Sequence, residues 1–416
     1  MKIVIMAAGS QGDVAPYTGM GVRLRDAGDE VALATHESCA PLVRECGLAF
    51  SRLPGGRDDT PSLSSSAAGA AGRSTEPTGR SLMGKAAAFI RELGQGIADA
   101  AGPGTDLLLL SVTTAPLGWQ VAEAMGIPSV GVYLQPVAPT SQFPPAVGGV
   151  GSLGRWGNRA AGRLSVRVAD RMYAVAVKQL RGRLGLPAAS LAAVRRRQER
   201  AGWPVLHGFS PVLVPRPADW RPGLDIVGNW WPHHQAGYRL PGELEDFLAS
   251  GPPPVFIGFG SMAGGDGDRL SEIAVQAVRQ ARVRGVLQRG RAGLAAADDD
   301  VITIGEVPHA CLFPRMAAVV HHAGAGTTAA GLRAGIPAVP VPVTADQPFW
   351  ARRTAGLGAA TNPIRFKDLS ASRLADAITT VLTDKTYRTQ AEAAAARIAT
   401  EDGAGKVTDT IRRIAG

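Results

Sequence analysis

Short apolar runs alternate with longer segments of helical pattern in both halves of the chain. Several runs are apolar at consecutive positions, which is typical of strands in a parallel sheet that helices cover on both faces. Strands that alternate with helices within each half predict two doubly wound α/β domains. The predicted strands occupy residues 2–8, 30–36, 48–54, 106–112 and 128–134 in the first half, and 254–260, 283–289, 301–307, 317–323 and 338–343 in the second.

The domain boundary is expected within residues 214–242, which are dense in Pro, Gly and Trp and have no helical period. A chain of 416 residues also exceeds what one hydrophobic core usually holds. We therefore expect a first domain over 1–220, a linker over 221–242 and a second domain over 243–400. The segment 401–416 is expected to form a C-terminal amphipathic helix. Packing of that helix against the first domain is one option that the sequence leaves open.

Composition indicates a globular chain, because 45% of the residues are hydrophobic and only 19% are charged. The net charge of +9 comes mainly from scattered Arg residues. The longest basic cluster, Arg195–Arg197, is more typical of a solvated helix face than of a nucleic-acid surface. Cys39, Cys46 and Cys311 lack the spacing of metal ligands. The apolar run Ile3–Ala8 is too short for a signal peptide, and no stretch reaches eighteen apolar residues. We expect a cytoplasmic protein without a stable membrane anchor or a nucleic-acid partner.

The first predicted strand ends in a turn of small residues, AAGSQGDVAP at 7–16. Small residues at a strand–helix turn let backbone N–H groups approach a phosphate. The spacing of Gly9 and Gly12 does not fit the dinucleotide motif G-x-G-x-x-G, which disfavours a dehydrogenase. Asp13 lies in this turn and has two interpretations. It either caps a helix expected over Ala15–Ala27 or serves as a catalytic carboxylate.

A second strand–helix turn lies at 321–328, HHAGAGTT. Its small residues leave the backbone open, and a predicted helix starts at the threonines. Free N–H groups, the positive end of a helix dipole and two hydroxyls together make an anion site. His322 would donate a hydrogen bond to a departing diphosphate, although a tight helix cap is the alternative. The small residues and threonines are Gly324, Ala325, Gly326, Thr327 and Thr328.

The next predicted strand, 338–343, delivers Asp346 and Gln347 at its carboxyl end. Adjacent parallel strands place such loops on one edge of a sheet. One loop would therefore hold phosphates, while the other holds sugar hydroxyls through carboxylate acceptors and an amide.

Residues 322–347 resemble the nucleotide-sugar signature of family 1 glycosyltransferases, which have the GT-B fold. In that signature a His-x-Gly-x-x-Ser/Thr turn is followed by Asp-Gln twenty-four residues after the His, and here 346 − 322 = 24. Four other stretches are similar to the branch that contains glycopeptide-antibiotic and sterol glycosyltransferases, so that the likeness covers essentially the whole chain. They are GSQGDVAP, HGFSPVLVPRPADW, PVFIGFGSM and GEVPHACLFPRM, at 9–16, 207–220, 254–262 and 305–316.

The resemblance implies that the second domain binds most of the nucleotide sugar. Ser261 and the turn from His322 to Thr328 would bind the diphosphate. The backbone of Val307 would meet the base, while Asp346 and Gln347 would hold the sugar.

The same resemblance implies that Ser10, Gln11 and Gly12 of the first domain approach the phosphates. Many relatives carry a His base at the position of Asp13, whereas this branch carries Asp. The implied catalytic residues are thus Asp13, His322 and Asp346. An ordinary Asp has a pKa of about 3.9, too low for an efficient base at neutral pH. Its pKa must therefore be raised, or its contribution is partly electrostatic.

Two long segments, 55–80 and 136–162, are candidate walls of an acceptor pocket in the first domain. They contain Phe143 and Trp156 but few charges other than Arg. This composition favours a large, partly apolar acceptor.

The chain departs from the family pattern at two positions. Ala330 replaces a Glu that binds ribose in many relatives, and Glu306 replaces a Trp that stacks on the base. The choice between uridine and thymidine donors therefore stays open. The Asp266–Asp268 pair has the spacing of a metal motif in another glycosyltransferase fold, but here it precedes a predicted helix that starts near Arg269, and we interpret it as a cap. No metal or cofactor is predicted besides the nucleotide sugar.

The predicted fold is GT-B, with two Rossmann-like domains that face each other across a cleft. The predicted function is inverting transfer of a hexose from a UDP- or dTDP-sugar to a hydroxyl of a secondary-metabolite aglycone. A sterol or terpenoid lipid glucosyltransferase is the nearest enzyme alternative, and a sugar-nucleotide epimerase of similar fold is another. A catalytically idle homologue that activates a partner enzyme is an alternative of a different class.

Overall fold

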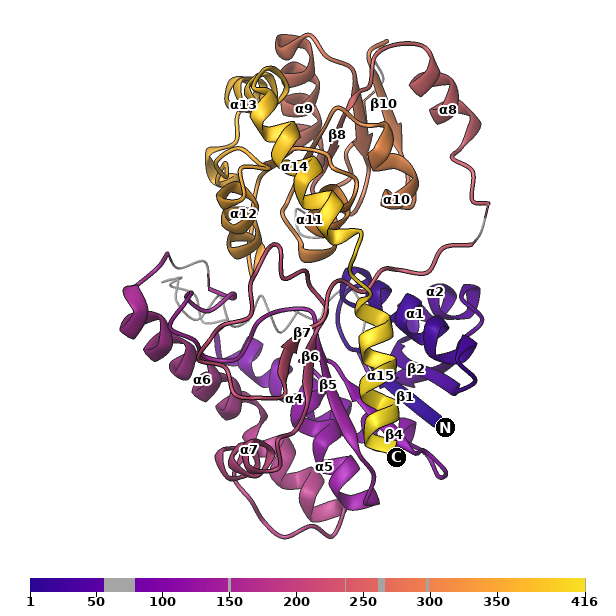
Figure 1. Cartoon of the computed structure of the whole chain (residues 1–416), viewed down its shortest axis with the longest axis vertical. Coiled ribbons are helices and arrows are strands. Elements are labelled where there is room, and N and C mark those ends of the chain that lie inside the picture. Colours follow the sequence, from indigo (N-terminus) through magenta and orange to yellow (C-terminus); the bar gives the residue numbers. More distant parts are fainter. Residues whose placement is uncertain (56–78, 149–150, 236, 261–265, 297–298, 416) are drawn as a thin grey trace. The chain divides into compact units, whose positions relative to one another are not determined.

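The computed structural model describes residues 1–55, 79–148, 151–235, 237–260, 266–296 and 299–415. The chain forms two compact units (Figure 1). The first unit comprises Met1–Pro211, Pro215–His234 and Asp402–Gly416, and the second comprises Val212–Val214 and Gln235–Glu401.

The first unit is built on a parallel sheet of seven described strands in the order β3-β2-β1-β4-β5-β6-β7. The strands are β1 Lys2–Met6, β2 Glu30–His36, β3 Ala49–Leu53, β4 Leu107–Leu110, β5 Ser129–Tyr133, β6 Val205–His207 and β7 Leu224–Ile226. The helices are α1 Gln11–Asp26, α2 Ala40–Glu45, α4 Gly79–Ala100, α5 Ala115–Met125, α6 Gly154–Arg183, α7 Leu191–Arg200 and α15 Gly403–Ala415, with a 3₁₀ turn at Glu37–Cys39.

Strand β1 shows why the sequence of this sheet is apolar at consecutive positions. Side chains alternate between the two faces of a strand. Ile3 and Ile5 are buried in one core cluster, together with residues of α1 and α15. Val4 and Met6 are buried in a second cluster, together with residues of α4, α5 and α6. Helices therefore cover both faces of the sheet, as the run of apolar residues predicts.

The C-terminal helix α15 is an integral part of the first unit. Val407 and Ile411 are fully buried in the core cluster that contains α1, and α15 lies beside α1 (Figure 1). Arg412 forms an ion pair with Asp29, with an Nη2–Oδ2 distance of 2.8 Å. Hydrogen bonds from Arg412 and the N-terminal amine, with the charges of these groups, hold the pKa of Asp29 below its ordinary value despite an opposing effect of burial.

The second unit is built on a parallel sheet of five described strands in the order β10-β9-β8-β11-β12. The strands are β8 Val255–Gly258, β9 Gly285–Gln288, β10 Val301–Ile304, β11 Ala318–His321 and β12 Ala338–Pro340. The helices are α8 Gly242–Ala249, α9 Gly267–Ala281, α10 His309–Leu312, α11 Ala325–Arg333, α12 Gln347–Gly356, α13 Ala371–Thr383 and α14 Lys385–Ile398, with 3₁₀ turns at Phe313–Arg315 and Phe366–Asp368.

The predicted doubly wound α/β class is confirmed in both units, and the ten predicted strands correspond to β1–β5 and β8–β12. Strands β6 and β7 were not predicted, since each is only three residues long. Strand β7 lies within residues 221–242, where a linker was expected, and it pairs with β6 in the first sheet. No helix in the described parts of the chain is long and apolar enough to cross a membrane.

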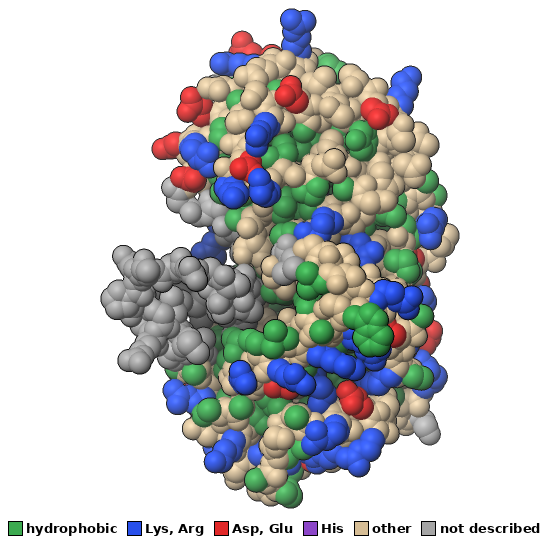
Figure 2. Space-filling view, turned by 90° about the vertical axis from the view of Figure 1, so that its left-hand side faces the viewer, with side chains coloured by type: hydrophobic (Ala, Val, Ile, Leu, Met, Phe, Trp, Pro, Cys, Tyr) green, Lys and Arg blue, Asp and Glu red, His purple; other side chains and the backbone are tan. Residues whose placement is uncertain are grey.

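Helix α6 differs from its neighbours because its exposed side carries large apolar residues. This helix lies at the left of Figure 1, the side that faces the viewer in Figure 2. On that face, Lys and Arg side chains gather together with hydrophobic ones over the first unit (Figure 2).

Candidate active site

In the first unit, the turn between β1 and α1 holds Asp13 close to the backbone. Helix α1 begins at Gln11, four residues before the expected start at Ala15, with Ser10 at the N-cap. The expectation that Asp13 precedes the helix is therefore wrong, because Asp13 lies in its first turn. Its Oδ2 accepts hydrogen bonds from the backbone N–H and the Oγ–H of Ser10, both at 2.8 Å. This is the carboxylate half of a capping box.

Gly9 is needed for this arrangement. A Cβ atom at Gly9 would lie 2.6 Å from Oδ2 of Asp13, which is closer than any van der Waals contact allows. The small residues of this turn thus serve two purposes. Gly9 makes room for the carboxylate, while Ser10, Gln11 and Gly12 are exposed at the helix start, where the helix dipole favours an anion.

The environment of Asp13 shifts its pKa in the direction that a base requires. Burial raises the pKa of Asp13 above its ordinary value, and the two hydrogen bonds from Ser10 and the influence of His36 offset only part of this effect. A carboxylate with a higher pKa accepts a proton more readily near neutral pH.

His36 was not predicted, although it lies at the end of β2 on the same sheet edge. Strand β2 pairs with β1, and the His36 side chain is buried. Burial lowers the pKa of His36, while hydrogen bonds to the backbone of Leu53 and Pro54 and the Asp13 carboxylate act in the opposite direction. His36 and Asp13 thus influence each other's pKa. Among the described residues, Nδ1 of His36 has no hydrogen-bond partner.

In the second unit, the turn between β11 and α11 encloses the ring of His322. A Cβ atom at Gly260 would lie 2.6 Å from Cε1 of this ring, and one at Gly324 would lie 2.5 Å from Nε2. Only glycine at both positions leaves space for the imidazole. At Gly326, by contrast, an added Cβ would meet nothing within 4 Å, so this part of the turn is open.

The two adjacent histidines have different environments. His321 is buried, and its Nδ1 accepts a hydrogen bond of 3.0 Å from the backbone N–H of Ala323. This contact braces the turn at Ala323, whose φ angle is 61°. His322 is half-buried, and burial lowers its pKa to about 4. At neutral pH His322 is therefore uncharged.

Two buried polar atoms of this turn lack hydrogen-bond partners among the described residues. They are Nδ1 of His322 and Oγ1 of Thr328. A buried polar atom without a partner costs about 1–3 kcal/mol, and most such atoms in proteins are satisfied. Thr328 lies in the first turns of α11, which begins at Ala325 with Gly324 as N-cap, and His322 lies in the turn that leads into this helix. An anion with several oxygen atoms is the type of ligand that this end of a helix binds.

The next turn along the sheet fixes Asp346 and Gln347. Oδ2 of Asp346 accepts a hydrogen bond of 2.7 Å from the indole N–H of Trp350. Oε1 of Gln347 accepts bonds of 2.8 and 3.0 Å from the backbone N–H groups of Val343 and Thr344. Strands β11 and β12 are adjacent and parallel, so this turn lies at the same sheet edge as the His322 turn.

Comparison with known proteins identifies the family of this chain. The sequence model described as "Glycosyltransferase family 28 N-terminal domain" matches residues 3–100, and that described as "Erythromycin biosynthesis protein CIII-like, C-terminal domain" matches residues 275–413. O-mycaminosyltylonolide 6-deoxyallosyltransferase of Streptomyces fradiae is 36% identical, over 97% of this chain and 95% of its own length. The chain belongs to the family of glycosyltransferases that includes this Streptomyces enzyme. The predicted family resemblance is thereby confirmed.

Other relatives of the glycosyltransferase fall into two groups. Glycosyltransferase GtfE of Amycolatopsis orientalis is 35% identical, over 99% of this chain and 97% of its own. A sterol 3-beta-glucosyltransferase of Arabidopsis thaliana is 34% identical over 97% of this chain, but the matched region spans only 64% of the plant protein.

Solved structures show the same fold. The calicheamicin glycosyltransferase CalG4 has a TM-score of 0.72 at 16% identity, over 99% of this chain and 98% of that one. Glycosyltransferase SsfS6 of Streptomyces sp. SF2575, complexed with thymidine diphosphate, has a TM-score of 0.63 at 21% identity, with 99% of each chain covered. The predicted GT-B fold is thus confirmed for this glycosyltransferase.

The remaining predicted site residues of the glycosyltransferase have varied environments. Ser261 lies outside the described residues, as does most of segment 55–80. Val307 is buried just after β10. Phe143 is also buried, whereas Trp156 on α6 is 91% exposed. No described observation joins Phe143 and Trp156 in one pocket.

Asp266 takes the N-cap position of α9, although its side chain makes no capping hydrogen bond. Its carboxylate instead pairs with Arg269, at an Nε–Oδ2 distance of 3.3 Å. Within the described ranges, no group of three or more His, Cys, Asp or Glu side chains could hold a metal ion.

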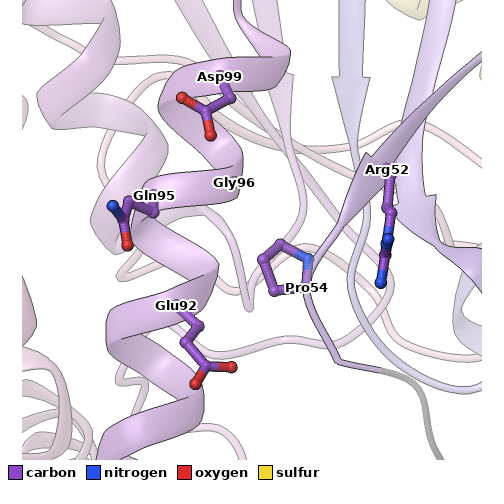
Figure 3. Close-up of a pocket in the computed structure, with 6 residues that line it drawn as sticks. All are labelled: Arg52, Pro54, Glu92, Gln95, Gly96 and Asp99. Carbon is purple, nitrogen blue, oxygen red and sulfur yellow. The ribbon is translucent and has the colours of Figure 1, made fainter.

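A groove of about 350 Å³ lies between β3 and α4 in the first unit (Figure 3). It contains none of the predicted site residues. At its centre the ring of Pro54 packs against the helix at Gly96, where a Cβ would lie 2.1 Å from Cδ of the proline. The lining residues are Arg52, Pro54, Glu92, Gln95, Gly96 and Asp99.

Proposed function

We propose that this glycosyltransferase moves a hexose from a UDP- or dTDP-sugar to a hydroxyl of a secondary-metabolite aglycone, with inversion. The main support is a pair of buried atoms without partners among the described residues, Nδ1 of His322 in the turn before α11 and Oγ1 of Thr328 within that helix. Oxygen atoms of a diphosphate would satisfy Thr328 directly. They would satisfy Nδ1 of His322 when the neutral ring carries its proton on that nitrogen.

The donor is proposed to lie mainly on the second unit. Gly324, Ala325, Gly326 and Thr327 would present backbone N–H groups and a hydroxyl to the diphosphate, with Ser261 beside them, and the backbone of Val307 would meet the base. The oxygen of Gln347 is used by backbone N–H groups, so its NH₂ group would face the sugar hydroxyls. Asp346 would accept hydrogen bonds from the same sugar, since its carboxylate is held in place by Trp350. Ser10, Gln11 and Gly12 of the first unit would add N–H groups to the phosphates.

The reaction is proposed as a single displacement. Asp13 takes the proton from the acceptor hydroxyl. At the same time the oxygen of that hydroxyl bonds to the anomeric carbon, and the bond from this carbon to the diphosphate breaks. The diphosphate leaves with the electron pair. The dipole of α11, the threonine hydroxyls and the neutral His322 stabilise the growing negative charge without a metal ion.

The acceptor is proposed to bind the first unit, with Phe143 and Trp156 as contributors. A secondary-metabolite acceptor is supported by relatives from Streptomyces and Amycolatopsis that match over nearly their full lengths. A sterol acceptor is the second candidate, supported by the plant relative at 34% identity. A cytoplasmic location is also part of the proposal, supported by three free cysteines.

The deciding experiment incubates the protein with a panel of UDP- and dTDP-sugars and aglycones, including sterols, and analyses the products by mass spectrometry. We expect a conjugate one hexose heavier than the aglycone, with release of an equal amount of nucleoside diphosphate. Conversion of the donor to an epimer without any conjugate would instead support the epimerase alternative. Conjugates of sterols alone would support the second candidate.

A further inference from the structure

The exposed side of α6 carries two adjacent rows of side chains, which we call the α6 surface. Spacings of four and seven residues place the members of an apolar row on one face of the helix. A cationic row runs beside it, because three of its members each lie three residues after a member of the apolar row. The apolar row is Leu164, Val168 and Val175, and the cationic row is Arg163, Arg167, Arg171 and Lys178.

The α6 surface is not needed to hold the helix in the first unit. The opposite side of α6 is buried in the core through Tyr173, Val177 and Leu180. Leu164, however, is 59% exposed and Val175 58% exposed. Of the eight large hydrophobic side chains that are exposed in the described parts of the chain, four lie on α6 and a fifth, Leu153, lies at its N-cap. Such a cluster is unusual for a surface that faces only water.

The charge on this surface is almost entirely positive. The sole acidic residue of α6, Asp170, is paired with Arg195 of α7. Figure 2 shows the resulting face, where Lys and Arg side chains surround hydrophobic ones. The binding partner should therefore offer both negative charge and an apolar layer within reach of one helix.

We propose that the α6 surface binds reversibly to an anionic lipid bilayer. A helix that lies in the membrane interface inserts its apolar side chains at the level of the lipid headgroups, while Lys and Arg side chains contact anionic headgroups. Trp156, 91% exposed near the N-terminal end of α6, is the residue type that prefers this depth. The proposal is independent of the reaction assigned to Asp13.

Two other partners fit the surface less well. A second copy of the chain, bound through a two-fold axis on α6, would bring two cationic rows together. A nucleic acid would satisfy the cations but would leave Leu164, Val168 and Val175 in contact with water or phosphate. A bilayer is the partner that satisfies both rows.

The test is co-sedimentation of the full chain with vesicles of phosphatidylcholine alone or mixed with phosphatidylglycerol, at low and high salt. We expect binding only to the anionic vesicles and release by high salt, since salt screens the attraction. The charge variant Arg163→Gln/Arg167→Gln should weaken binding roughly twenty-five-fold, because each of the two cations contributes about a fivefold effect. The apolar variant Leu164→Ser/Val168→Ser should weaken it at least roughly tenfold.

A matched control removes two exposed cations from the second unit, Lys385→Gln/Arg397→Gln, which lie on α14. This variant has the same net charge as the charge variant and should bind vesicles nearly as well as the wild type. All variants should keep the wild-type melting temperature and transfer activity. Absence of binding at low salt, or equal losses in control and charge variant, would overturn the proposal.

Two further outcomes would also overturn it. If the apolar variant binds vesicles like the wild type while the charge variant does not, and duplex DNA shows the same pattern, the surface is a polyanion site. If the wild type is a dimer by analytical ultracentrifugation and both α6 variants are monomers, the partner is a second copy of the chain.

Discussion

The two strand–helix turns of the candidate site have the same topology but opposite hydrogen-bond states. In the β1–α1 turn, the Asp13 carboxylate has partners within the chain, because it accepts two hydrogen bonds from Ser10. In the β11–α11 turn, Nδ1 of His322 and Oγ1 of Thr328 are buried without a described partner. The carboxylate of the first turn thus needs no ligand, whereas a ligand that supplied the missing contacts would stabilise the second turn.

This difference suits the two proposed roles. A base must be held in one orientation before the acceptor arrives, and bonds within the chain achieve this. A donor site gains affinity and selectivity if its polar atoms are satisfied only in the complex. If the two turns have these roles, a change at Asp13 should lower turnover the most, and removal of metal ions should affect activity the least.

Asp13→Asn should lower turnover by roughly a hundred- to ten-thousandfold, which is the usual contribution of a general base. Asn keeps the shape of Asp and accepts the bonds from Ser10, but it does not take a proton near neutral pH. Donor affinity should hardly change. Steady-state kinetics would measure the turnover, and a binding titration would measure the dissociation constant of the donor. Asp26→Asn, at the exposed C-terminal end of the same helix, is the matched control and should keep full turnover.

The pH dependence of this variant gives an independent readout. Burial raises the pKa of Asp13 above its unfolded value, so the charged form disfavours the folded state. The associated stability is present at low pH and is lost as the pH rises through the folded-state pKa. Asp13→Asn should therefore keep or slightly increase the melting temperature at pH 7 relative to wild type, and lose the acid limb of the kcat/KM profile. A turnover within threefold of wild type would remove Asp13 as the base and make Asp346 the next carboxylate to test.

His322→Ala should lower turnover by roughly a hundred- to a thousandfold at saturating donor, as expected for loss of one donor to a developing anion. Because the pKa of His322 is about 4, the effect should be constant between pH 6 and 8. His233→Ala removes an imidazole outside both turns and should have no such effect. Unchanged turnover in His322→Ala would leave His322 as a packing residue between two glycines.

Thr328→Val should weaken donor binding about tenfold or more, since a hydrogen bond to a charged group contributes about 1.5–3 kcal/mol. The same change should stabilise the ligand-free protein by about 1 kcal/mol, because it removes a buried hydroxyl without a described partner. Thr354 is equally buried, but its hydroxyl donates to the Trp350 carbonyl. Thr354→Val should therefore lower the melting temperature. Calorimetric titration would measure the affinity for the donor, and thermal unfolding would measure the stability of both variants. A lower melting temperature of Thr328→Val would contradict the difference between the two turns.

Excess chelator should leave activity unchanged, since the α11 dipole, hydroxyls and N–H groups are proposed to replace a metal ion. Initial rates before and after chelation would measure this. Loss of activity that magnesium or manganese restores would show that the second turn binds a metal–diphosphate complex.

Much of the fold could be predicted from the sequence, because strands that are buried on both faces give uninterrupted apolar runs. Strands β6 and β7 were missed because three residues produce no such run. The start of α1 was misplaced because Asp13 is a good N-cap residue in sequence terms, and only the structure shows Ser10 at that position.

The residues of the site could be predicted less completely. The sequence indicated Asp13 and His322, but it did not indicate His36, since its position depends on β2 being the neighbour of β1. Gly324 was interpreted as part of an opening for a phosphate, and Gly260 was given no role of its own. The structure shows that both glycines make room for the imidazole ring. Such contacts between distant residues leave no periodic signal in a sequence.

The position of α15 has a consequence for chimeric enzymes. Most of the second unit runs from Gln235 to Glu401, and the chain returns to the first unit at Asp402, so the unit that we propose binds the donor is an insertion rather than a C-terminal half. A hybrid made with one crossover would carry a foreign α15, whose buried residues at 407 and 411 must fit the core of another protein. Exchange of donor specificity between relatives therefore calls for two crossovers, one on each side of the inserted unit.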